Sequence, residues 1–137
     1  MEPDSANATH LVVLLSLSVI LLLFHILLQA SFATKELGRS WNAGPRDEGQ
    51  QPTSIRAGRA ARASKNYQET YPAFIGLLLG LAFIGDPTGL GIGGAWVWLI
   101  SRIAYVPIYL AGIAYIRTLV WALSVVGLLI MMSALLA

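Results

Sequence analysis

The residues best suited to chemistry lie on one predicted helix, between residues 59 and 72, which runs on into an apolar stretch at residues 73–84. At about 100° per residue, one stripe of this helix carries Arg59, Arg62, Asn66 and Glu69. Charges on a helix that enters a bilayer must face a protein interior or a wet cavity, because lipid does not accept them. A juxtamembrane helix whose arginines only bind lipid phosphate is the simpler alternative, but it explains neither the amide nor the carboxylate.

A second polar group lies in a later apolar run, where Arg102, Tyr105 and Tyr109 share one helical face. An arginine inside a membrane costs at least about 2.5–3.5 kcal/mol unless it is paired. Counted from the cytoplasmic ends of their helices, Glu69 and Arg102 lie about 12 and 14 residues deep. We therefore predict a structural ion pair between them. Arg117 is expected to end the helix that carries Arg102, at the cytoplasmic side.

The composition is that of an integral membrane protein. Of 137 residues, 56% are hydrophobic and 12% are charged, and the mean hydropathy is +0.68. The absence of cysteine excludes disulfides, thiolate metal sites and cysteine nucleophiles. His10 and His25 make no metal-ligand spacing, so no metal is expected. We expect His25 to be a neutral histidine bonded to a carbonyl or a neighbouring helix; a proton relay is the alternative.

The apolar runs predict an all-α membrane protein, a bundle of four membrane-spanning helices in one domain over residues 1–137. The helices are expected at about residues 9–33, 56–84, 95–116 and 118–136. Pro72 lies inside the second of these and favours a kink. Glycines and prolines in residues 34–55 predict an exposed loop, and those in residues 85–94 a turn-rich connection.

The charge distribution predicts the orientation in the membrane. Seven of the nine basic residues lie between Lys35 and Lys65, against three acidic ones. The positive-inside rule places this connection in the cytoplasm and both termini on the other side. We expect a multi-pass protein of the inner or plasma membrane, if the source is bacterial, with its site toward the cytoplasm. No nucleic-acid partner is expected.

The spacing Arg-x-x-Arg-x-x-x-Asn-x-x-Glu at residues 59–69 resembles the second-helix signature of the MAPEG superfamily, the membrane-associated proteins in eicosanoid and glutathione metabolism. Residues 101–117, with Ser-Arg-x-x-Tyr-x-x-x-Tyr and a later arginine, are similar to its third-helix pattern. The resemblance covers about residues 55–118. It implies a four-helix bundle assembled as a homotrimer, with glutathione bound between protomers toward the cytoplasm.

The resemblance also implies a role for each residue. Glutathione binding is implied for Arg59, Arg62, Asn66, Glu69 and Tyr105. Catalytic roles are implied for Arg117, which would hold the glutathione thiolate, and for Tyr109 beside it. A positive charge near sulfur lowers the pKa of the thiol and so raises the amount of nucleophile at neutral pH.

The function predicted on this basis is a membrane-embedded, glutathione-dependent transferase or peroxidase. It would use glutathione as co-substrate and act on a lipophilic electrophile that enters from the bilayer. Arginine side chains suit the carboxylates of glutathione. One alternative is a non-catalytic lipid- or glutathione-binding membrane protein of the same fold. A small channel or transporter is a third reading, which the mixed charges near one end of the second helix disfavour.

Overall fold

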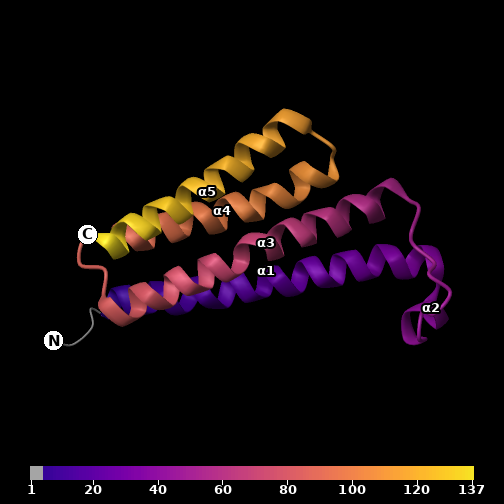
Figure 1. Ribbon diagram of the computed structural model, residues 1–137, viewed down its shortest axis with the longest axis horizontal. Helices are drawn as coiled ribbons and strands as arrows, with labels where there is room; N and C mark the ends of the chain where they lie inside the picture. Colours follow the sequence, from indigo (N-terminus) through magenta and orange to yellow (C-terminus); the bar gives the residue numbers. More distant parts are fainter. Residues whose placement is uncertain (1–4) are drawn as a thin grey trace.

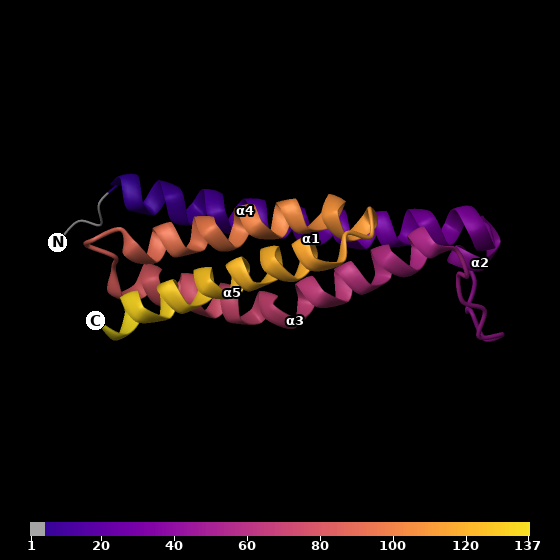
Figure 2. The ribbon, with the colours of Figure 1, turned by 90° about the horizontal axis from the view of Figure 1, so that it is seen from above.

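Helices make up most of residues 5–137, the part of the chain that this computed structural model describes, and no strand occurs there. The elements in order are α1 (Ser5–Leu37), α2 (Arg39–Ala43), α3 (Ile55–Ile84), α4 (Leu90–Leu110) and α5 (Ala114–Leu136). The four long helices run alternately in opposite directions, with α1 beside α3 and α4 beside α5 (Figure 1). The predicted all-α fold is therefore confirmed. The end of α1, α2 and the start of α3 lie at one end of the bundle, and α5 ends at the other (Figure 2).

Three of the long helices, α1, α4 and α5, are long and apolar enough to cross a membrane. The polar first half of α3 keeps that helix, of 30 residues, outside this group. Large apolar side chains point outward from the bundle, with Leu27 65% exposed on α1 and Leu119 62% exposed on α5. Such a surface is suited to lipid and unsuited to water. The chain is a multi-pass integral membrane protein.

The third long helix begins five residues before its predicted start, because Asp86 caps it. The Asp86 carboxylate accepts hydrogen bonds from the amide nitrogens of Gly91 (3.2 Å) and Ile92 (2.8 Å). The first amides of a helix have no partner within the helix, so a carboxylate at this point stabilises the first turn. The glycines of residues 91–94, predicted as a connection, therefore belong to α4.

The same helix ends six residues before its predicted end. Gly112, with φ 75°, adopts a left-handed conformation that stops the helix, and α5 starts at Ala114. Arg117 therefore lies in the first turn of α5, which corrects its predicted place at the end of the third helix. The other long helices begin and end within four residues of their predicted bounds, and α3 continues through Pro72.

Two glycines bring α4 and α5 into backbone contact. A Cβ atom on Gly127 would lie 2.7 Å from the carbonyl oxygen of Gly94 and 2.7 Å from the amide nitrogen of Trp98. Small residues allow this close approach between membrane helices. Trp98 itself is fully buried and stacks on Phe74 of α3, with ring centroids 3.9 Å apart. Aromatic packing around Trp98 thus helps to join the hairpin of α4 and α5 to α3.

Candidate functional site

The basic and aromatic residues singled out in the sequence gather where α3 begins, α4 ends and α5 begins. These three helix ends lie toward the end of the bundle that carries α2 (Figure 1). The side chains linked there by contacts are Arg59, Arg62, Asn66, Arg102, Tyr105, Tyr109 and Arg117. We call this group the arginine cluster. It takes residues from three helices, so its geometry depends on how those helices pack.

Tyr109 lies between two guanidinium groups of the arginine cluster. The Arg62 Nε atom donates a hydrogen bond to the Tyr109 hydroxyl oxygen at 3.1 Å. The Arg117 guanidinium carbon lies 5.1 Å from the centroid of the Tyr109 ring, a cation–π distance. Arg62 is exposed, whereas Tyr109 and Arg117 are half-buried. The two residues predicted to be catalytic are therefore in contact, although they come from different helices.

Tyr105 lies next to Tyr109, on the side toward the interior of the bundle. Its ring centroid is 5.4 Å from that of Tyr109, and the side chain is only 1% exposed. The Arg102 guanidinium carbon lies 4.4 Å from the centroid of the Tyr105 ring, a cation–π distance. Tyr105 therefore supports the arginine cluster from inside the bundle and is not part of its open surface.

Arg102 has a different partner from the one predicted. The side chain is fully buried, and its Nη1 atom donates a hydrogen bond to Asn66 Oδ1 at 2.8 Å. Within residues 5–137 no carboxylate oxygen lies within 4.0 Å of Arg102. Glu69 is exposed, and within the described residues no hydrogen bond joins it to Arg102. The predicted ion pair between Glu69 and Arg102 is therefore not formed.

The shifted end of α4 explains this difference. With the helix ending at Leu110, Arg102 lies eight residues from that end, whereas the prediction assumed about fourteen. Asn66 is nearer to the start of α3 than Glu69 by three residues, or nearly one helical turn. Because Arg102 lies closer to this end of the bundle than predicted, it reaches the Asn66 amide, and the Glu69 carboxylate, nearly one turn farther along α3, is out of its reach.

Arg59 caps the end of α4. Its Nη1 atom donates a hydrogen bond to the carbonyl oxygen of Leu110 at 3.0 Å. The last carbonyls of a helix lack partners within the helix, and a cation there is also favoured by the helix dipole. A Cβ atom on Gly112 would lie 2.5 Å from Arg59 Nη2, so the guanidinium fills the space that glycine leaves. The sequence did not predict this contact, because every residue type has a backbone carbonyl and the sequence does not show which carbonyls lack a partner.

His25 also differs from the prediction. The side chain is 1% exposed, and its ring packs on Tyr67, with ring centroids 4.9 Å apart. Neither ring nitrogen has a hydrogen-bond partner within residues 5–137, so the expected bond to a carbonyl or another helix is not formed. Tyr67 uses its hydroxyl elsewhere, donating to the carbonyl oxygen of Ser18 at 2.5 Å.

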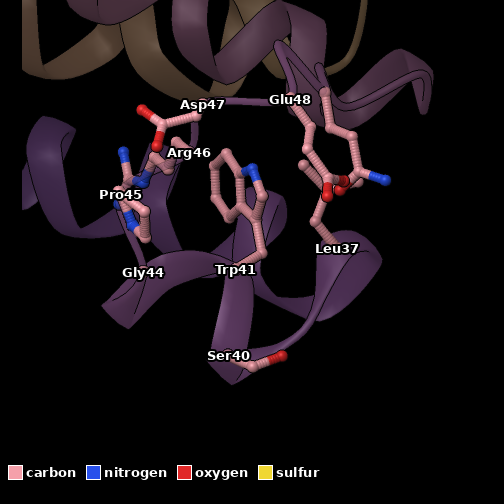
Figure 3. A pocket seen from close by; sticks show the side chains of 9 residues that line it. Leu37, Ser40, Trp41, Gly44, Pro45, Arg46, Asp47 and Glu48 are labelled. Carbon is pink, nitrogen blue, oxygen red and sulfur yellow. The ribbon is translucent and has the colours of Figure 1, made fainter.

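The arginine cluster lies outside the two cavities described for this chain. One, of about 360 Å³, surrounds Trp41, with Arg46 and Asp47 on one side and Leu37 and Glu48 on the other (Figure 3). The Arg46 guanidinium carbon lies 4.3 Å from the Trp41 ring centroid and occupies that face of the ring. A second cavity, of about 540 Å³, lies between α1 and α2. Arg62 is the one exposed member of the arginine cluster, which therefore reaches the surface of the single chain at that residue.

Comparison with protein families gives a match that extends over nearly the whole chain. A family model described as MAPEG family matches residues 11–137. This range contains every member of the arginine cluster and all four long helices except the first turns of α1. No curated protein and no solved structure matches the chain. The match confirms the resemblance seen in the sequence, and the chain belongs to the MAPEG family.

Proposed function

We propose that this protein is a membrane-embedded, glutathione-dependent transferase or peroxidase that acts on a lipophilic electrophile. The observation that carries the proposal is the convergence of Arg62, Tyr109 and Arg117 from three helices at one end of the bundle. Membership of a family associated with glutathione and eicosanoid metabolism supports the same chemistry. An exposed cation beside a half-buried cation and a phenol is a suitable surface for an anionic thiol peptide.

The contacts suggest a different role for each of Arg62, Tyr109 and Arg117. Arg62 is the exposed arginine and binds a carboxylate of glutathione. Because Arg62 donates to the oxygen of Tyr109, the hydroxyl proton of Tyr109 remains free for donation to sulfur. Arg117 lies over the other side of that ring and stabilises the thiolate by its charge. The thiolate then attacks the electrophile, which arrives from the bilayer.

Arg102 and Arg59 act indirectly in this proposal. Arg102 holds Asn66 by its amide oxygen, which leaves the two N–H groups of that amide for an acceptor on the peptide. Arg59 holds the end of α4, and with it the turn that leads from Tyr109 to Arg117. This revises the earlier expectation that Arg59 binds glutathione directly.

A second copy of the chain completes the site in this proposal. Arg62, Lys65 and Glu69 lie on one side of α3 and are all exposed on the single chain. If α3 is the fourth membrane span, lipid cannot cover this stripe, but another protomer can. A homotrimer, as the family resemblance implies, places glutathione between protomers. The basic residues at this end of the bundle orient the site toward the cytoplasm.

The test separates thiolate formation from binding. Arg117→Ala is expected to abolish the ultraviolet absorbance of bound thiolate and to lower kcat against a model electrophile, with glutathione still bound. Arg62→Ala is expected mainly to raise KM, since it removes an interaction that substrate and transition state share. Arg56→Ala removes an exposed arginine one residue into α3 and is the matched control. Wild-type turnover by Arg117→Ala would refute the assignment, and binding without ionisation in the unaltered protein would favour the non-catalytic alternative.

A further inference from the structure

A groove lies in the corner between the last turns of α1 and the short helix α2. Gly38, with φ 95°, ends α1 and turns the chain, and α2 follows at once. The corner is held by a hydrogen bond of 2.8 Å from Asn42 Nδ2 to Thr34 Oγ1. The groove has a volume of about 540 Å³ and includes Lys35 and Arg39. It is separate from the arginine cluster, which lies on α3, α4 and α5.

The groove is apolar at one end and cationic at the other. Leu27 and Ala30 line the end nearer the middle of α1, and Lys35 and Arg39 line the end at α2. From Leu27 to Lys35 the helix rises about 12 Å, at 1.5 Å per residue. That rise spans the change from the hydrocarbon core to the headgroup layer of a bilayer. The polarity of the groove therefore follows the polarity of a phospholipid.

The two cations of the groove have no counter-ion in the part of the chain that the structure describes. Within residues 5–137 no carboxylate oxygen lies within 4.0 Å of Lys35 or Arg39. Glu36 stands between them in sequence but turns to the loop instead. Its Oε1 atom accepts bonds from the amide and hydroxyl of Thr53, both at 2.6 Å, and its Oε2 atom accepts one from the amide of Ser54. The positive charge in the groove is thus open to an external anion.

The apolar end of the groove continues along the lipid-facing side of α1. Ile20, Leu23 and Phe24 fall on the same helical face as Leu27 and are 60%, 51% and 48% exposed. This apolar track fits an acyl chain, which a soluble phosphate lacks. We propose that the groove binds one anionic phospholipid, with its phosphate between Lys35 and Arg39 and an acyl chain along Leu27. Ser31, on the wall between the two ends, donates to the ester region.

The test compares phosphatidylglycerol with phosphatidylcholine of the same acyl chains, added to delipidated protein in neutral detergent and counted by native mass spectrometry. Each cation near a membrane contributes about 1 kcal/mol, so two of them predict a preference for the anionic lipid of about thirty-fold. Lys35→Gln/Arg39→Gln is expected to remove this preference, and Arg56→Gln, an exposed arginine outside the groove, to keep it. Equal binding of both lipids, or a preference that survives in the double variant, would overturn the proposal.

Two further arms identify the source of the phosphate. Leu27→Ser shortens the apolar track and is expected to weaken phosphatidylglycerol binding several-fold. Inorganic phosphate at millimolar concentration is expected not to displace the lipid. Displacement by inorganic phosphate together with unchanged lipid binding by Leu27→Ser would show a soluble-anion site and would refute the lipid assignment. The substituted side chains Leu27, Lys35 and Arg39 are all exposed, so the variants do not disturb the core.

Discussion

Replacement of Gly112 by alanine adds one methyl group at the turn that joins α4 to α5. Two effects follow from the structure. Gly112 has φ 75°, which an alanine adopts at a cost of roughly 1–2 kcal/mol. The new Cβ atom would also lie 2.5 Å from Arg59 Nη2, which is too close for either atom to stay in place. The guanidinium is the far end of a flexible side chain, so it moves and the backbone does not.

The movement of Arg59 removes its hydrogen bond to the carbonyl oxygen of Leu110. A hydrogen bond that involves a charged group contributes about 1.5–3 kcal/mol. Gly112→Ala is therefore expected to lower the free energy of unfolding by about 2.5–5 kcal/mol in total, the sum of strain and the lost bond. In the background of Arg59→Ala only the strain remains, so the same substitution should cost roughly 1–2 kcal/mol there.

A double-mutant cycle measures the difference, with equilibrium unfolding of the four proteins in mixed micelles of sodium dodecyl sulfate. The expected coupling free energy between Arg59 and Gly112 is about 1.5–3 kcal/mol. Gly89→Ala is the matched control, because Gly89 also has φ 75° but a Cβ atom there meets nothing within 4 Å. It should show the strain alone, in both backgrounds. If Gly112→Ala costs the same with and without the Arg59 side chain, the proposed cap of α4 is wrong.

Three other substitutions test the packing around the site by the same unfolding measurement. Asn66→Leu leaves the buried Arg102 without its hydrogen-bond acceptor and should lower the free energy of unfolding by about 1.5–3 kcal/mol. Glu69→Gln should change it by less than about 0.5 kcal/mol. A larger loss for Glu69→Gln than for Asn66→Leu would instead support an ion pair between Glu69 and Arg102. Asp86→Ala should cost about 1–2 kcal/mol, because two amides of the first turn of α4 lose their acceptor. Gly127→Ala should cost about 1–3 kcal/mol, because its Cβ atom meets the backbone of α4, and unchanged stability would exclude that contact.

The faces of the helices were predictable from the sequence, because side-chain periodicity within one helix needs no knowledge of its neighbours. The spacing of Arg102, Tyr105 and Tyr109 placed them on one face, and in the structure each contacts the next. The existence of four long helices followed equally from the apolar runs. The family resemblance supplied the proposed role of Arg117, which the residue type alone does not suggest.

The contacts between helices were less predictable, because they depend on where each helix ends. Residues 111–116 remain mostly apolar, so hydropathy carried the third helix past Gly112. A positive φ at one glycine is a local backbone property that composition does not reveal. Because the predicted end of the third helix was wrong, the prediction assigned Arg117 to the wrong helix. It also gave Arg102 the wrong depth, and hence the wrong partner.

The position of Arg117 in α5 gives the α4–α5 hairpin its part in the proposed chemistry. An arginine at the end of α4 would move together with Tyr109, whereas Arg117 reaches Tyr109 only if α5 keeps its register against α4. One contact fixes that register directly, and a second holds the end of α4 in place. Gly94, near the start of α4, and Gly127 bring the two backbones together, and Arg59 ties the last turn of α4 to α3. Small shifts at either place alter the distance between the charge and the phenol, so residues without any contact to glutathione should affect kcat through the same pair.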